Sequence, residues 1–242
     1  MKHCIKEPVP ALFKARDNLA LAVDAHLAGD FETARLKFKA ADTLAVFFWL
    51  NPCWYDVEKN VLYPHPDGDT FLVPREQRDP DRAIAASVRA EVLARDGYRC
   101  RYCALPVIGA GIRKIAHALY PEAVPWDSHD LRRQHAGFAA LWLQYDHVVP
   151  HSHGGRSNAE NVVIACGLCN FAKHGYTLRQ LGLSDPRLRL PQPVEWDGLE
   201  RLRLNPWARA GAAADRLTTR HSDAAASVVR ADESVRTTGK AP

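Results

Sequence analysis

The sequence predicts an α+β protein in which helices accompany a smaller β-containing unit. Two helical segments separated by Gly29-Asp30 lie near the N-terminus, a proline-punctuated stretch with short apolar runs follows, and a further helical pattern leads directly into Cys100. The chain has 242 residues, 47% hydrophobic and 25% charged. This composition is ordinary for a globular protein, so we expect a packed core.

Residues 1–55 are predicted to form a helical hairpin. Helices are expected over residues 15–28 and from residue 31 to about 49, because Gly29 can end one helix in a left-handed conformation and Asp30 can cap the next. The turn is similar to that of a tetratricopeptide pair, but a solenoid needs about three repeats and one copy is present. We therefore expect an accessory hairpin, which either docks a protein partner or packs on the core.

The remaining segments follow from composition and periodicity. Residues 56–80 are predicted to form a joint of short strands and turns, with apolar runs at 61–63 and 71–73. A helix is expected from Ala83 to Arg95, with Ile84, Val88 and Val92 on one face. The predicted domain at 81–183 contains an insertion at 104–145, whose second half is expected to be helical from Ser128 through Trp142. Residues 184–207 are predicted to pack on it as an extended tail, and 208–242 to be disordered.

Charge and cysteine content limit the class of protein. Lys and Arg exceed Asp and Glu by 32 to 28, and the net charge of +4 suits a polyanionic partner. The longest apolar run, residues 44–50, is far shorter than the roughly 20 residues of a membrane span. With no secretory leader visible, we expect a cytoplasmic protein without membrane contact. Its six cysteines are then metal ligands or free thiols rather than disulfides.

Two cysteine pairs share a spacing that is typical of zinc ligands. Each Cys-x-x-Cys turn aims two thiolates at one point, and two turns complete the tetrahedral sulfur shell that Zn²⁺ prefers. The sequence therefore predicts a structural zinc site that fastens two distant segments of the chain. Its ligands are Cys100, Cys103, Cys166 and Cys169.

The residues between and after these pairs resemble the HNH (ββα-metal) endonuclease family, in the branch braced by a four-cysteine zinc site. The resemblance covers about residues 83–183. It rests on motifs in the family's order: Asp146-His147-Val148-Val149-Pro150, the Gly154-Gly155 turn, Asn161, and Cys166-x-x-Cys169-Asn170 followed by Lys173. It implies a ββα-metal nuclease domain that hydrolyses DNA phosphodiesters.

The resemblance also implies a role for each motif residue. His147 is expected to act as general base, and Asn161 is expected to orient its imidazole through a hydrogen bond. Asp146 and Asn170 are expected to hold a catalytic cation, and their oxygen ligands suit Mg²⁺ or Mn²⁺. Asn170 stands where the family name has its last histidine, which leaves the choice of ion open.

Further side chains near the motifs are candidate contacts. Lys173, Arg101 and Arg156 are possible phosphate contacts, and other basic residues gather around the first cysteine pair: Arg95, Arg99, Arg113 and Lys114. The alternative for each is a solvated basic side chain. His151 and His174 are reserve candidates for base or ligand. No base-reading element is identifiable, so sequence preference is expected to be modest.

Two rival functions remain open from the sequence. A noncatalytic zinc module that binds nucleic acid would explain the cysteines and the basic residues, but it would not need Asp146, His147, Asn161 and Asn170 together. An interaction protein would use the N-terminal hairpin for recruitment and the zinc domain as a scaffold. Metal-dependent nicking of DNA distinguishes both from a nuclease.

Overall fold

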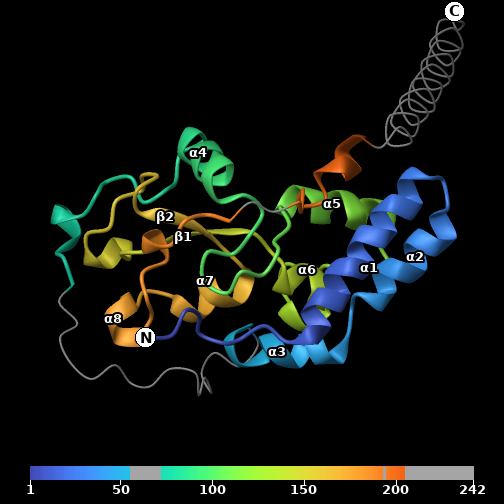
Figure 1. Ribbon diagram of the computed structural model, residues 1–242, viewed down its shortest axis with the longest axis horizontal. Coiled ribbons are helices and arrows are strands. Elements are labelled where there is room, and N and C mark those ends of the chain that lie inside the picture. The colour runs from blue at the N-terminus through green and yellow to red at the C-terminus, as the bar shows by residue number, and fades with distance from the viewer. Residues whose placement is uncertain (55–71, 193–194, 205–242) are drawn as a thin grey trace, which may run out of the picture. The chain divides into compact units, whose positions relative to one another are not determined.

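The computed structural model describes residues 1–54, 72–192 and 195–204 (Figure 1). Residues Met1–Arg203 form one compact unit, whose architecture is given below for its described residues. The expected strand at 61–63 and the expected disordered tail at 208–242 lie outside the described residues. Within the described ranges, no helix is long and apolar enough to cross a membrane. The predicted domain boundaries stay predictions.

A two-stranded sheet and the helix after it form the centre of the unit. Strand β1 (Gln144–His147) pairs antiparallel with β2 (Val162–Ala165), with Asp146 opposite Val163. Helix α7 (Gly167–Lys173) follows β2 directly and contacts β1. All four residues of β2 are buried. This ββα arrangement confirms the predicted α+β class.

The N-terminal hairpin consists of α1 (Pro10–Leu27) and α2 (Phe31–Ala40), which pack together. Gly29 has a φ of 84° and the Asp30 side chain accepts a hydrogen bond from the Thr33 amide, as expected for the turn. Leu21 and Leu36 are exposed on the hairpin. Its use as a docking site for a partner stays a prediction.

The predicted second helix is interrupted, because a separate helix α3 begins at Leu44 and runs to Trp54. The break falls where two polar side chains are used. The Thr43 hydroxyl accepts from the Val46 amide, and the Asp42 carboxylate accepts from the Ala136 amide of the insertion at 2.8 Å. A continuous helix would not provide this cap and this contact.

The insertion contains α5 (Ala110–Leu119), which the sequence did not predict, and α6 (Ala136–Ala140). The helix expected from Ser128 through Trp142 is wrong: a 3-10 turn η3 (Leu131–Arg133) precedes α6. Helix α6 begins late because the His135 ring accepts from the Phe138 amide, which makes His135 its N-cap. Helix α6 packs against α1, α3 and α7, and thereby joins the hairpin to the ββα unit.

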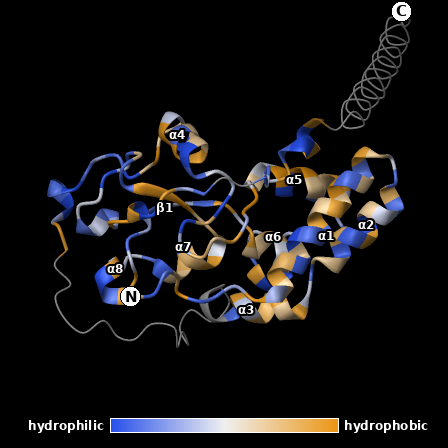
Figure 2. Ribbon diagram, in the orientation of Figure 1, coloured by the Kyte–Doolittle hydropathy of each residue, from blue (hydrophilic) through white to orange (hydrophobic). Residues whose placement is uncertain are grey.

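Helix α4 (Ala86–Asp96) packs on β2, with Val92 buried, and it begins three residues later than expected. The smaller helices are η2 (Arg75–Gln77), η4 (His151–His153), α8 (Leu178–Leu181), η5 (Pro186–Leu188) and η6 (Glu200–Leu204). The segment at 184–204 packs on the unit through buried Leu199 and Leu202 and through the Trp196 indole, which donates to the Val107 oxygen. Figure 2 shows the apolar residues of the N-terminal helices interspersed with polar ones.

Candidate functional site

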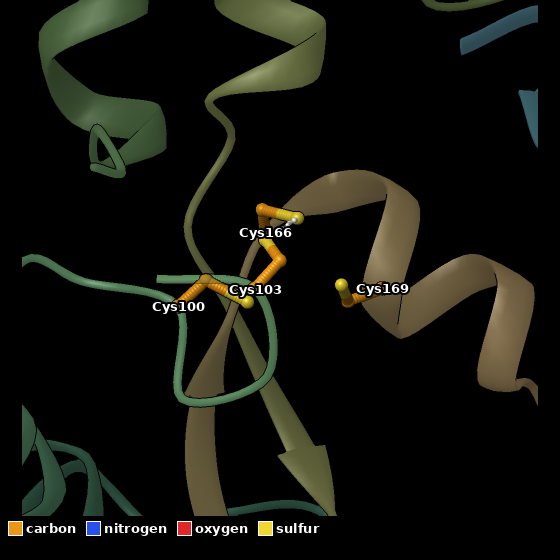
Figure 3. A group of neighbouring side chains, drawn as sticks. All are labelled: Cys100, Cys103, Cys166 and Cys169. Atoms are coloured by element: carbon orange, nitrogen blue, oxygen red, sulfur yellow. Dashed lines mark hydrogen bonds between the residues drawn. The ribbon is translucent and has the colours of Figure 1, made fainter. Parts of the chain in front are cut away.

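Four cysteines converge beside the β1–β2 sheet (Figure 3). The ligand atoms of Cys100, Cys103, Cys166 and Cys169 all lie within 4.8 Å of one another. The Cys103 and Cys166 sulfurs are 3.7 Å apart. A tetrahedral site with Zn–S bonds of about 2.3 Å has sulfurs roughly 3.8 Å apart, so the cluster fits this ion in both donor type and dimensions.

Local backbone structure brings the two pairs together. In the first turn, the Ala104 amide donates to the Cys100 oxygen, and Ala104 takes a positive φ of 62°. The Arg101 amide donates to the Ile164 oxygen of β2 at 2.8 Å, which anchors this turn to the second pair. Although burial raises it, hydrogen bonds from the other cysteines hold the pKa of Cys100 well below its usual value. The cluster therefore favours a thiolate, which a bound cation would stabilise further.

Asp96 organises the arginines next to this cluster. Its carboxylate pairs with Arg95 and with Arg101, both at 2.8 Å, and it accepts from the Ile164 amide at 3.0 Å. The Arg101 side chain is only 8% exposed and also donates to the Pro186 oxygen. The expectation that Arg101 contacts phosphate is therefore wrong, because its guanidinium is committed to internal acceptors.

Most of the other basic residues around the first pair are also used internally. Arg95 donates to the Val162 oxygen, and Arg99 donates to the Ala104 oxygen and to Gln192. Arg113 is buried, with its guanidinium 3.5 Å from the centroid of the Trp126 ring. Lys114 is exposed. The expected phosphate-binding face around this pair is thus largely absent from the described part of the chain.

A cavity of about 560 Å³ lies against strand β1 and helix α7, and it brings together several of the expected residues. Asp146, His147 and Asn170 contribute to its wall, with the reserve candidates His151 and His174. The remaining lining residues are Arg78, Arg82, Tyr145, Pro150, Ser152, Phe171 and Gly175. Strand β1, the loop that follows it, helix α7 and the segment before α4 therefore meet at one hollow.

Asp146 is buried at this cavity and is held by two side chains. Tyr102 donates its hydroxyl to Oδ2 at 2.6 Å, and the Lys173 ammonium lies 3.2 Å from Oδ1. Lys173 also donates to the His147 oxygen at 2.7 Å and is 1% exposed. Burial raises the pKa of Asp146, while Lys173 and Tyr102 act in the opposite direction. The expected phosphate contact of Lys173 is wrong, since its ammonium is enclosed with Asp146.

Ser157 determines which nitrogen of His147 carries the proton. The Ser157 hydroxyl donates to the Arg82 oxygen at 3.1 Å, and its oxygen lies 2.9 Å from Nε2 of His147. A hydroxyl has one proton to donate, so Nε2 must be the protonated nitrogen and must donate to Ser157. The neutral ring then carries its lone pair on Nδ1. Burial, followed by the charges of His151, Lys173 and Arg82, lowers the pKa of His147 and favours this neutral form.

Asn161 holds the loop backbone rather than the imidazole. Its side-chain oxygen accepts from the Val149 amide, and its amide nitrogen donates to the oxygens of Val149 and Arg156, at 2.9 to 3.0 Å. The expected hydrogen bond between Asn161 and His147 is therefore absent, because both amide protons and the side-chain oxygen contact the loop backbone instead. A Cβ at Gly155 would lie 1.8 Å from the Val149 oxygen, so only glycine permits this close approach.

The remaining candidates differ in their contacts. The side-chain amide of Asn170 makes no hydrogen bond with another described residue, although it lines the cavity. His174 is exposed and ends α7 with a φ of 49°, so its ring is available at the rim. His151 contacts the Asp79 oxygen through Nε2 at 2.7 Å. Arg156 is exposed, and its possible contact with phosphate stays a prediction.

Sequence reasoning missed four residues of the site. Tyr102 lies inside the first cysteine pair and Ser157 in the Gly-Gly loop, and neither position reveals its distant partner. Arg78 and Arg82 fall in the stretch at 75–82, where three arginines are balanced by Glu76, Asp79 and Asp81, so net charge gave no signal.

Comparison with known proteins supplies one match. Residues 139–175 match the family described as HNH endonuclease, a stretch that includes both strands, the intervening loop and α7. No curated protein and no solved structure matches the chain. The family implies nuclease activity in general. The chain thus carries an HNH endonuclease segment at residues 139–175, consistent with the branch that a four-cysteine cluster braces.

Proposed function

We propose that the chain is a metal-dependent endonuclease that hydrolyses phosphodiester bonds of DNA. The single observation that supports this most is the shared cavity, to which Asp146, His147 and Asn170 all contribute. The donor set suits a hard divalent cation such as Mg²⁺ or Mn²⁺. Asp146 accepts one hydrogen bond at each oxygen, and a carboxylate has about four lone-pair sites, so capacity for a ligand remains.

The cation would be held by Asp146 and Asn170, with His174 as a further donor at the rim. When bound, it would neutralise charge on the phosphate and stabilise the leaving oxygen. Lys173 and Tyr102 position the Asp146 carboxylate for this role. A structural zinc, which the four cysteines would hold, would be a separate ion and would keep the loop of Tyr102 against the strand of Asp146.

His147 supplies the base for hydrolysis. Nδ1 accepts a proton from water as the water oxygen bonds to phosphorus, and the ester bond to the leaving oxygen breaks. The leaving oxygen takes the electron pair of that bond and gains a proton from solvent. Ser157 keeps Nε2 protonated, so Nδ1 is the nitrogen that accepts. Asn161 contributes by fixing the loop that carries Ser157.

Cleavage of supercoiled plasmid in Mg²⁺, Mn²⁺ or EDTA tests the proposal. We expect metal-dependent nicking by the wild type and a loss of roughly 10²- to 10⁴-fold in His147→Ala, with fold and zinc content unchanged. His129→Ala is the matched control, because His129 is exposed in the insertion and does not line the cavity. Wild-type cleavage by His147→Ala would make His151 the next candidate base.

The same assay identifies the substrate and distinguishes the nuclease from the two alternative functions. Linear, branched and RNA substrates establish which nucleic acid is cleaved. A wild type that binds DNA but never cleaves with either ion would favour the noncatalytic zinc module. A wild type that neither binds nor cleaves would favour the interaction protein with the zinc domain as scaffold.

A further inference from the structure

Four arginines surround the hollows that adjoin the catalytic cavity. Arg78 and Arg82 line that cavity itself, and a second hollow beside it is lined by Arg75, Arg78 and Arg82. A third lies between Arg78 and Arg156. We call Arg75, Arg78, Arg82 and Arg156 the arginine arch. Because neighbouring hollows share Arg78, the arch extends from the cavity rim along one continuous surface.

The segment that carries three of these arginines is attached to the catalytic loop through its backbone. The Val73 amide donates to the Ser152 oxygen at 3.0 Å. The oxygen of Asp79 contacts the His151 ring at 2.7 Å, and that of Arg82 accepts from the Ser157 hydroxyl at 3.1 Å. Figure 1 shows this segment, with η2, beside the loop that follows β1. The Arg78 guanidinium supports this attachment from within the segment, since its Nε donates to the Val73 oxygen at 2.7 Å. The side chains of Arg75, Arg82 and Arg156 are exposed and make no hydrogen bond with another described residue.

The arch arginines also differ from most others in their partners. Arg95, Arg101, Arg187, Arg201 and Arg203 each pair with a carboxylate. Among the described residues, no carboxylate lies within ion-pair distance of the four arch guanidiniums. Glu76, Asp79 and Asp81 carry as many negative charges as the three arginines of this segment, and Asp79 lines both outer hollows. The arch is therefore set apart by guanidinium groups without an ion-pair partner beside the cavity, and its local net charge is only that of Arg156.

We propose that the arginine arch binds the phosphodiester groups that flank the cleaved one on a nucleic-acid strand. The planar guanidinium fork matches phosphate oxygens and stays charged at all relevant pH values. The arch thus holds the strand by its backbone, in one direction along the surface from the cavity, and sequence contributes little. This inference rests on the proposed function, since it assigns that function's substrate contacts.

The strength and salt dependence of binding test the arch without any cleavage. In the full-length His147→Ala background with EDTA, anisotropy of a labelled DNA duplex gives binding constants at several salt concentrations. The variant Arg78→Gln/Arg82→Gln should weaken binding about tenfold or more. It should also reduce the slope of log K against log salt by about 1.8, because each lost contact with B-DNA contributes about 0.9. A short inorganic phosphate titration separates capture of free phosphate from binding of a strand.

The control pair is Arg132→Gln/Arg133→Gln, which removes the same charge from exposed residues that do not line the cavity. The slope of log K against log salt should differ from that of the parent protein by less than about 0.3 for this control. If both double variants weaken binding and reduce the salt slope equally, the proposal that the arch binds the strand is wrong. If Arg78→Gln/Arg82→Gln weakens DNA binding as expected but the wild type never cleaves DNA, the proposed hydrolysis is wrong, whereas the proposed binding of phosphodiesters by the arch is supported. Unchanged thermal unfolding of each variant establishes that lost binding reflects lost contacts.

Discussion

Two aspartates beside the β1–β2 hairpin are almost equally buried, but they have different surroundings. Asp96, 3% exposed, accepts from two arginines and a backbone amide, which make two contacts at each of its oxygens. Asp146, 4% exposed, receives one phenol and one ammonium and adjoins the cavity. Burial alone therefore does not identify a functional carboxylate. The number of protein donors does, because a carboxylate with unused lone pairs can accept a ligand.

The same contrast separates the surroundings of the cysteine cluster from those of the cavity. Near the cysteine cluster, charged groups such as Arg101 are committed to internal partners, so these residues should mainly affect stability. At the cavity, Asn170 and the arch arginines keep groups without protein partners, so they should mainly affect binding and rate. The following predictions test this division.

Loss of the cysteine cluster should have the largest effect. Cys166→Ser removes one of four sulfurs that lie within 4.8 Å of each other, and structural zinc sites contribute about 10–16 kcal/mol of apparent binding energy. This exceeds the stability of many domains. We expect a poorly folded product by circular dichroism, and one zinc per chain in the wild type by elemental analysis. Folded wild-type protein that contains no zinc would contradict this prediction.

Substitution of Asp96 should have the next largest effect, and it should act on stability. Asp96→Ala leaves the buried Arg101 without its charge partner, which typically costs about 3–5 kcal/mol of unfolding free energy. Urea denaturation in saturating zinc measures this change.

Asp146 provides the matched comparison. Asp146→Asn also leaves a buried cation, Lys173, without its charge partner. Unlike Asp96, however, Asp146 has only one ion-pair partner among the described residues, which is Lys173. The double variant Asp146→Asn/Lys173→Met should therefore recover most of the lost unfolding free energy, short only of the hydrogen bond from Lys173 to the His147 oxygen, while it still fails to cleave DNA. Recovery of Asp96→Ala by Arg101→Met should be incomplete, since Arg95 and the Ile164 amide would still lack their acceptor. Equal recovery in both pairs would remove the distinction between the two aspartates.

Ser157 should change the rate with little effect on stability. Ser157→Ala removes the acceptor of the Nε2 proton of His147, and the ring can then adopt the other tautomer. We expect the maximal cleavage rate to fall about 10- to 100-fold, as for other supporting contacts in active sites. The substrate concentration at half-maximal rate should change little, because Ser157 does not contact the strand in our proposal.

Ser157→Thr is the control, since it retains the hydroxyl and should retain most of the rate. If Ser157→Ala instead lowers the unfolding free energy and leaves the maximal rate intact, the hydroxyl serves only to join the loop to residue 82.

Features that depend on fixed local spacing were predictable from the sequence. Each cysteine pair and the Gly29-Asp30 turn specify their chemistry within a few residues, and the order Asp146, His147, Asn170 was assigned through the family resemblance. The structure confirms the α+β class and clusters the four cysteines as expected. It also brings Asp146, His147 and Asn170 to one cavity, although their roles stay predictions.

Features that depend on distant partners were not predictable. Lysine and arginine side chains usually lie at the surface, so the sequence did not predict that Lys173 and Arg101 are buried. They are buried because the fold pairs Lys173 with Asp146 and Arg101 with Asp96. Ser157 contacts the oxygen of a residue 75 positions away. Helix α6 begins at Ala136 because His135 also contacts the Phe38 oxygen, 97 residues away. Periodicity carries no information on such contacts.

The smallest predicted effect concerns His135, a buried group whose two ring nitrogens are both used. Nδ1 accepts from the Phe138 amide, so Nε2 carries the proton and donates to the Phe38 oxygen. Burial lowers the pKa of His135, against the opposing charge of Asp42. In the unfolded chain a histidine has a pKa of about 6.5, so the unfolded state binds a proton first as the pH falls.

His135 therefore contributes fully to the free energy of unfolding above about pH 6.5. This contribution declines as the pH falls toward the lower pKa of the folded state, by up to about 1.4 kcal/mol per pH unit. Urea denaturation from pH 8 to pH 5.5 measures it as the difference between the wild type and His135→Asn. Asparagine can still accept from the Phe138 amide as an N-cap but does not titrate. Because the thiolates of the cysteine cluster titrate equally in both proteins, their effect cancels in this difference. The difference should favour the wild type most at high pH and narrow on acidification. If the difference in unfolding free energy between the wild type and His135→Asn does not change with pH, His135 contributes only through packing and helix capping. Its titration would then have no part in joining the hairpin to the ββα unit.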